Sequence, residues 1–109
     1  MTDCDLLELA AKAADIGIWW CDQRQSFYRA GYQVAWNPLI DDGDALRLAV
    51  KLSLRVHVDI DCITKSIEVN YFDDGSYCHT VSDQNFDDAY AATRHSIVRA
   101  AAELGKMKG

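Results

Sequence analysis

Residues 36–52 read WNPLIDDGDALRLAVKL, and they predict a strand end, a sharp turn and a helix. Pro38 fixes its own φ and biases Asn37 toward an extended conformation, so a strand that ends at Trp36 has to turn here. We expect Trp36 to pack at the turn and anchor the helix, as an apolar residue ahead of a helix cap often does. The segment therefore predicts architecture rather than chemistry.

Three carboxylates open this helix. Asp41 or Asp42 can accept hydrogen bonds from the free N–H groups of the first turn, and Asp44 adds negative charge at the positive end of the helix dipole. A calcium loop that starts at Asp41 would need a glutamate at its twelfth position, which is Leu52, so we interpret the aspartates as a cap. The expected buried face has the spacing i, i+3, i+4, i+7 and consists of Ala45, Leu48, Ala49 and Leu52.

Two further helices are predicted. The first is capped at position 2 or 3, runs to about Ala14 and ends at Gly17. Its expected buried stripe consists of Leu6, Leu9, Ala10 and Ala13. The last helix begins after residues 83–87 and stops at Gly105. Its expected buried stripe consists of Tyr90, Ile97, Ala101 and Leu104, with Arg94 on the same side.

Five strands are predicted from alternation and turn residues. They lie at 18–21, 27–36, 55–60, 67–71 and 77–81, with turns at 22–25 and 73–76. In the third strand Val56, Val58 and Ile60 point one way. The order α-β-β-α-β-β-β-α predicts one α+β domain over residues 1–109. In it, an antiparallel sheet of four to five strands packs with three helices in a two- or three-layer sandwich.

Charge and composition limit the possible partners. The chain carries a net charge of −6, from 17 acidic and 11 basic residues, so we expect no direct binding to nucleic acid. Aspartates gather at 41–44, 73–74 and 83–88, where they form an ordinary solvated surface or present carboxylates to a basic partner. The apolar runs are shorter than the about 20 residues of a membrane span, and no signal peptide is visible. We therefore expect a cytoplasmic protein that does not bind membranes.

Two motifs resemble small phage and prophage proteins of the ABA-sandwich type. The first is Trp36-Asn37-Pro38 followed by Asp41-Asp42-Gly43-Asp44-Ala45 and an apolar helix. The second is DAYAATRHSIVRAA at residues 88–101, which is similar to the A-x-A-R-A-I-x-x-A pattern that ends such proteins. The resemblance implies a phage-encoded accessory protein inside a bacterial host cell. That family has no established activity, so the resemblance implies no catalytic residue.

Four aromatic residues form the predicted interface. Trp19 and Trp20 are adjacent on a strand, so their side chains point to opposite faces. We expect one of them to join the core and the other to be exposed or buried against a partner. Tyr28 and Tyr32 share the parity of one face of the return strand and flank the exposed tryptophan. Exposed aromatic clusters are common anchors of protein interfaces.

An alternative function depends on five residues that could hold a metal. His57 and Asp59 share a face of one predicted strand, and Cys62, Cys78 and His79 lie near the ends of this and a later strand. If the sheet brings them together, they make a metal-dependent enzyme or binding site. The tight ligand pair of structural zinc sites is missing, as are phosphate loops and nucleophile elbows, so we predict no cofactor and no catalytic residue.

The four cysteines are expected to be reduced and buried as small apolar residues. Cys4, Cys21, Cys62 and Cys78 are far apart in the sequence and form no C-x-x-C pair. The leading prediction is a non-enzymatic, phage-type accessory protein that binds protein. The partner is a second copy of the chain or a host factor, such as a defence complex that an acidic surface would inhibit.

Overall fold

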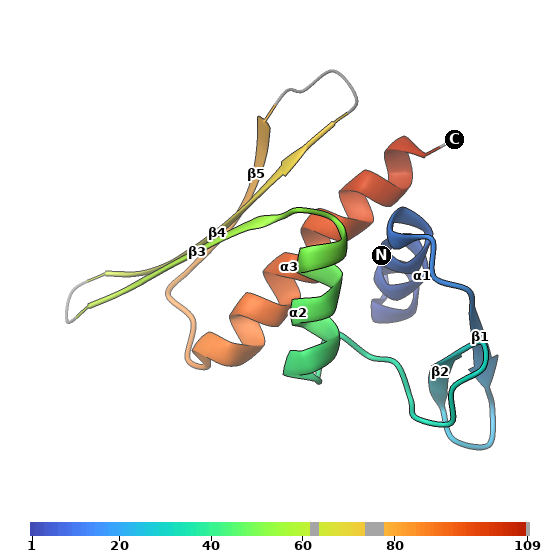
Figure 1. Cartoon of the computed structure of the whole chain (residues 1–109). Coiled ribbons are helices and arrows are strands. Elements are labelled where there is room, and N and C mark those ends of the chain that lie inside the picture. The colour runs from blue at the N-terminus through green and yellow to red at the C-terminus, as the bar shows by residue number, and fades with distance from the viewer. Residues whose placement is uncertain (62–63, 74–77, 109) are drawn as a thin grey trace.

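The computed structural model describes residues 1–61, 64–73 and 78–108 (Figure 1). In chain order its elements are α1 (Asp3–Ala14), β1 (Ile18–Cys21), β2 (Ser26–Arg29), α2 (Asp42–Lys51), β3 (Arg55–Ile60), β4 (Lys65–Phe72), β5 (Cys78–Gln84) and α3 (Ala89–Met107). The predicted α+β class with three helices and five strands is confirmed. The aspartate–glycine turn and the beginning of the last predicted strand fall on residues 74–77, which lie outside the described residues.

The five strands form two antiparallel sheets, so the prediction of a single sheet of four to five strands is wrong. β3, β4 and β5 form one sheet with β4 in the centre, and β1 and β2 form a separate hairpin. The predicted return strand over 27–36 ends at Arg29, because Gly31 takes a φ of 86° and redirects the chain. Ala35 returns to β2 through an isolated bridge with Tyr28.

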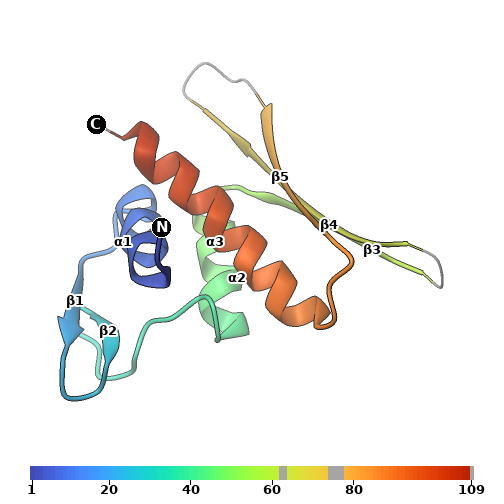
Figure 2. The same ribbon diagram turned by 180° about the vertical axis from the view of Figure 1, so that it is seen from behind.

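All three helices lie on one face of the β3–β4–β5 sheet (Figures 1 and 2). Ile67, Val69 and Tyr71 of the central strand point toward the helices and are buried, whereas Glu68 on the other face is exposed. The β1–β2 hairpin lies on the opposite side of the helices from this sheet (Figures 1 and 2). In the described part of the chain no helix covers the outer face of the sheet, so the three-layer arrangement with helices on both faces does not form there.

α3 is the central helix, and it packs against α1, α2 and the sheet. The predicted stop at Gly105 is wrong, because the helix continues to Met107 and buries this glycine. A Cβ at Gly105 would lie 2.1 Å from the carbonyl oxygen of Leu9, so the glycine permits close packing of α1 on α3. Tyr90 was expected in the buried stripe of this helix, but it is exposed at the first turn.

α1 begins with a reciprocal cap. The Thr2 hydroxyl accepts a hydrogen bond from the Asp5 backbone N–H, and the Asp5 carboxylate accepts one from the Thr2 backbone N–H. These contacts lower the pKa of Asp5, with the Thr2 backbone donor as the largest cause. The helix ends at Asp15 in a left-handed conformation rather than at Gly17. The buried residues of α1 are Leu7, Ala10, Ala11, Ala13 and Ala14, while the expected Leu6 and Leu9 are half-buried.

A hydrogen-bond network holds the turn before α2. Asp41 is the N-cap, and its Oδ2 accepts from the Asp44 backbone N–H at 2.8 Å. Asp44 is itself buried, and its Oδ2 accepts from the backbone N–H of Asn37 at 3.0 Å. Arg47 donates to Asp44 Oδ1 at 2.7 Å, and this hydrogen bond raises the pKa of the guanidinium. Asn37 in turn accepts from the Leu39 backbone N–H, which fixes the turn from both ends.

Trp36 lies beneath this turn, with 3% of its surface exposed. Its backbone N–H donates to the Phe27 carbonyl at 2.8 Å, so the residue joins the hairpin to α2. Pro38 is also fully buried. The predicted buried face of α2 is confirmed for Ala45, Leu48 and Ala49, and Leu52 is half-buried.

Candidate functional site

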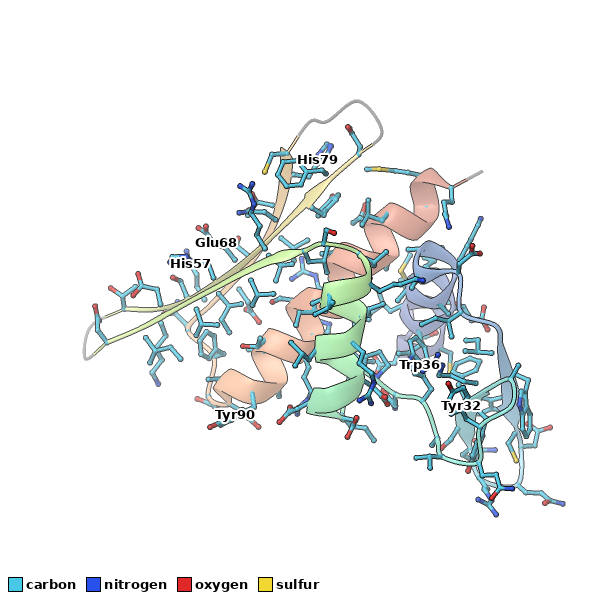
Figure 3. The ribbon with its side chains drawn as sticks, viewed as in Figure 1. Tyr32, Trp36, His57, Glu68, His79 and Tyr90 are labelled. Atoms are coloured by element: carbon cyan, nitrogen blue, oxygen red, sulfur yellow. The ribbon has the colours of Figure 1, made fainter. Side chains whose placement is uncertain are left out.

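An apolar groove of about 500 Å³ lies between α2, the first half of α3 and β3. We call it the α2–α3–β3 groove. Its lining is almost entirely apolar: Ala45, Leu46 and Ala49 from α2, Val56, Val58 and Ile60 from β3, and Ala89 and Ile97 from α3, with Tyr90 and Thr93 at the α3 side. Figure 3 shows Tyr90 at the first turn of α3, where it forms a rim of the groove.

The β3 side of the groove is open because α3 packs chiefly against β4 and β5. Val56, Val58 and Ile60 share one face of β3, as predicted, but they are 39%, 47% and 48% exposed. Their neighbours across the β3–β4 ladder, Val69 and Ile67, are completely buried. The apolar face of the sheet thus extends past the helical cover and reaches solvent at its β3 edge.

The backbone of β3 is also open along this edge. β3 is an outer strand of its sheet, and no strand in the described part of the chain pairs with its second edge. The Asp61 backbone N–H donates to the Thr64 carbonyl. Asp61 and Thr64 directly follow the Ile60–Lys65 pair, so they continue the β3–β4 register as a hydrogen-bonded pair. Hydrogen-bonded and non-hydrogen-bonded pairs alternate in such a ladder, so the odd-numbered residues of β3 bond to β4. The N–H and C=O groups of Val56, Val58 and Ile60 therefore point to the free edge.

Arg94 forms the polar end of the groove. Its Nε donates to the Leu39 carbonyl at 2.9 Å, and its Nη1 donates to Asp42 Oδ1 at 2.6 Å. These bonds tie α3 to the turn before α2, across more than 50 residues of sequence. Because the guanidinium is already paired with a carboxylate, the groove holds a neutral, mostly apolar surface rather than a charged site.

Exposed apolar residues on α2 continue this surface. Leu46 lines the groove and Val50 follows it one helical turn later, and both side chains are exposed. Surface residues scattered singly are normal, but a contiguous apolar patch is typical of an interaction site. Leu46 and the three apolar residues of β3 form such a patch in the groove. The sequence already contained a sign of this surface, because Leu46 and Val50 are apolar residues that lie outside the predicted buried face of α2.

The aromatic hairpin differs from its prediction. Neither tryptophan joins the core, since Trp19 is 50% and Trp20 is 39% exposed. Trp19 stacks on Tyr28 with ring centroids 5.2 Å apart, and Trp20 packs its edge on Phe27 at 5.0 Å on the other face. These rings are direct neighbours in the β1–β2 register. Each tryptophan therefore packs on an aromatic ring of the opposite strand, and no second layer is needed to cover it.

Three of the four predicted interface aromatics come together. Trp19, Tyr28 and Tyr32 line a shallow cavity of about 330 Å³ with Arg24, whereas Trp20 lies on the opposite face of the hairpin. Tyr28 is buried, and its hydroxyl accepts a hydrogen bond from Arg24 at 3.1 Å. Tyr32 lies beyond β2, exposed beneath the guanidinium of Arg29 at 4.5 Å. The prediction placed Tyr32 beside Tyr28 because both were expected on one face of the same strand. Tyr32 lies outside β2, so it reaches the cavity for another reason.

The residues of the metal alternative are divided between the two faces of the sheet. His57 and Asp59 lie on the outer face of β3, and Figure 3 shows His57 beside Glu68 on that face. His79 lies on the inner face of β5, stacked on Tyr71 and bonded to the Asp73 carboxylate at 2.9 Å. Cys78 is on the outer face of β5, and Cys62 lies outside the described residues. Within the described ranges no three His, Cys, Asp or Glu side chains are grouped to hold a metal ion.

The cysteines were expected to be buried, and this prediction is wrong for three of them. Cys4 and Cys78 are exposed, and Cys21 is half-buried beside the aromatic cavity.

The acidic clusters do not form one surface. Asp73 lies beside Leu104 near the end of α3, whereas Asp88 caps the first turn of the same helix. The stretch of α3 from its cap at Asp88 to Leu104 is about 24 Å long at a rise of about 1.5 Å per residue, so the two clusters are far apart. At the third cluster, Asp42 and Asp44 are engaged by arginines. The aspartates therefore serve chiefly as caps and ion-pair partners in this fold.

Among the residues that the structure describes, no helix is both long and apolar enough to cross a membrane. Comparison of the chain with protein-family models, with curated proteins and with solved structures finds no match. The resemblance to phage proteins therefore stays a prediction, and function has to be inferred from the geometry above.

Proposed function

We propose that this protein acts by binding another protein chain, which adds a strand to the free edge of β3 and inserts apolar side chains into the α2–α3–β3 groove. The observation that carries this proposal is the coincidence of two features at one place. The free edge of β3 offers unpaired N–H and C=O groups, and the same strand turns Val56, Val58 and Ile60 toward the groove. Backbone bonds from an added strand supply affinity, and apolar pockets beside it supply specificity.

The edge of β3 lacks proline and inward-pointing charges, two features that often protect such strands. Natural edge strands are often interrupted by proline or bulges, or carry inward-pointing charges that oppose pairing. β3 is a regular strand of six residues, and every residue that it turns toward the groove is a β-branched apolar residue. This combination supports a partner strand rather than a permanently solvated edge.

Selection from a displayed library of ten-residue peptides tests the proposal. We expect selected peptides to bind the parent protein and to shift the backbone NMR signals of Val56, Val58, Ile60 and Leu46. Val58→Lys should abolish binding, because it places a charge on the groove side of the strand. Ser82→Lys, on the exposed outer face of β5, is the matched control and should bind as the parent does.

Two results would overturn the proposal. One is a selection that yields no binding peptide from a protein that light scattering shows to be monomeric, so that no second copy covers the edge. The other is a set of peptides whose signals map to Trp19, Tyr28 and Tyr32, since the aromatic hairpin would then be the binding surface. In the phage setting that the sequence resemblance suggests, the bound protein is either a second copy of the chain or a protein of the bacterial host.

A further inference from the structure

We infer that the chain which occupies the β3 edge is a second copy of this protein, in a two-fold dimer whose β3 strands pair antiparallel into a six-stranded sheet. This inference rests on the proposed function, because it names the partner for the same edge and groove. It is carried by the residue order of β3, which is complementary to itself.

The backbone restricts the possible registers. Val56, Val58 and Ile60 direct their N–H and C=O groups to the free edge, so hydrogen-bonded pairs across the dimer have to join these even-numbered residues. A register shift of one residue would turn the apolar side chains of one copy to the wrong face. A two-fold axis perpendicular to the sheet at Val58 satisfies both conditions and keeps the helices of both copies on one side.

The outer face pairs basic with acidic residues in this register. His57 lies across from Asp59 of the other copy, and Arg55 lies across from Asp61 of the other copy, each pair occurring twice. Opposite charges directly across an antiparallel pair are favourable, and like charges are unfavourable. The basic residues occupy the first half of β3 and the acidic residues its end and the residue after it. Antiparallel self-pairing therefore joins the unlike charges of Arg55 and Asp61, and it sets the imidazole of His57, a hydrogen-bond donor, across from the Asp59 carboxylate.

The inner face gains apolar pairs in the same register. Val58 meets Val58 of the other copy at the axis, and Val56 meets Ile60 of the other copy on either side. These are the helix-facing side chains of β3 that the single chain leaves about half exposed. The exposed Leu46 of α2 lines the same groove, so an isologous interface can cover it as well.

Light scattering after gel filtration, at chain concentrations from about 1 to 100 µM, tests the dimer across the usual affinity range. We expect a species of twice the 12.2 kDa of one chain. Val58→Lys places two lysines together at the axis and should weaken dimerisation at least tenfold, whereas Ser82→Lys should not change it. Val58 is half exposed in the single chain, so a lysine there can extend to solvent without unfolding the protein.

A charge exchange keeps the test decisive if Val58→Lys lowers solubility. His57→Asp places aspartate across from Asp59 and should weaken the dimer. The double variant His57→Asp with Asp59→Lys places unlike charges across from each other and should recover dimerisation. If His57→Asp leaves the dimer unchanged, or if the double variant fails to recover it, the register is wrong and the inference falls.

Amide hydrogen exchange gives a position-specific readout. In the dimer the amides of Val56, Val58 and Ile60 donate to the other copy and should be protected, and Val58→Lys should expose them. The His57 and Asp59 amides bond to β4 and should be protected in both proteins. A parent that stays monomeric at every concentration refutes the inference but leaves the proposed function standing if library peptides bind this edge. A dimer whose even-numbered β3 amides exchange freely is formed elsewhere, and it also refutes the inference.

Discussion

Gly105→Ala tests the packing of α1 on α3. In an ordinary helix interior, replacing glycine with alanine stabilises a protein by about 1 kcal/mol. At this position the new Cβ would lie 2.1 Å from the Leu9 carbonyl oxygen and 2.8 Å from the Leu9 carbonyl carbon. An ordinary contact begins near 3.4 Å, so the two helices have to separate by more than an ångström. Both obstructing atoms belong to the backbone, and no change of side-chain rotamer can relieve the contact.

The expected loss follows from two opposing contributions. Overpacking of this kind costs about 1–3 kcal/mol and more when the backbone itself has to move, which offsets the gain in helix propensity. Separation of the helices also loosens the contacts of Leu7, Ala10 and Ala14 with the core. We expect a net loss of about 2 kcal/mol in the free energy of unfolding, which is a fall of roughly 8 °C in Tm for a chain of this length.

Thermal and urea melts of the variant measure this loss. Gly43→Ala is the matched control, because its Cβ would meet the ends of the flexible Arg47 side chain at 3.2 Å, together with Asp41 Oδ2 at 3.3 Å. The Arg47 side chain can move aside, so the control should melt within a few degrees of the parent. A Gly105→Ala protein that melts at or above the parent temperature would show that α1 and α3 are not in close contact, and the reasoning would be refuted.

Four further predictions concern single residues. Trp36→Ala removes a fully packed side chain and should cost about 3–5 kcal/mol, which a urea melt would show as near-complete loss of the folded state. Trp19→Ala and Trp20→Ala each remove one exposed cross-strand aromatic contact and should cost about 1 kcal/mol; a loss as large as that of Trp36→Ala would mean that the tryptophan is buried. Ser96→Ala removes a buried hydroxyl that has no hydrogen-bond partner among the described residues, so stability should stay equal or rise by up to about 1 kcal/mol, and a clear fall in Tm would reveal a partner. Burial raises the pKa of Tyr71 above its usual value of 10.0, so the unfolded chain loses this proton first and stability should fall as the pH rises above 10; melts between pH 8 and 11 should show a smaller decline for Tyr71→Phe than for the parent.

The sequence was sufficient where a structural feature depends on neighbouring residues. The Asp41 cap follows from a carboxylate ahead of an apolar-periodic segment, and the buried face of α2 follows from residue spacing. The alternation in β3 likewise identified the residues that share a face. Each of these properties is determined within a few residues of chain, and each appears in the structure where the local pattern placed it.

Features that depend on tertiary position were missed. Gly105 looks like a helix stop in sequence, because the reason for a glycine there is the backbone of Leu9, almost the whole chain away. Alternation predicted the orientation of Val58 but not its exposure, which arises because β3 is an edge strand beyond the cover of α3. Tyr90 was placed in the buried stripe by spacing, although the first turn of α3 extends past the core. The candidate groove was missed for the same reason, since its three walls come from separate parts of the chain.

The close packing of the first helix on the last has a consequence for how the protein is made. α1 leaves the ribosome before α3, with Leu7 and Ala10 on a face whose partner is α3, the last element that the structure describes. At about 5–20 residues per second, synthesis of the intervening chain takes several seconds, and the last turns of α3 then still have to leave the exit tunnel. The nascent chain therefore holds an apolar helix without its native partner during those seconds, and the core closes only after α3 has been made and has left the exit tunnel.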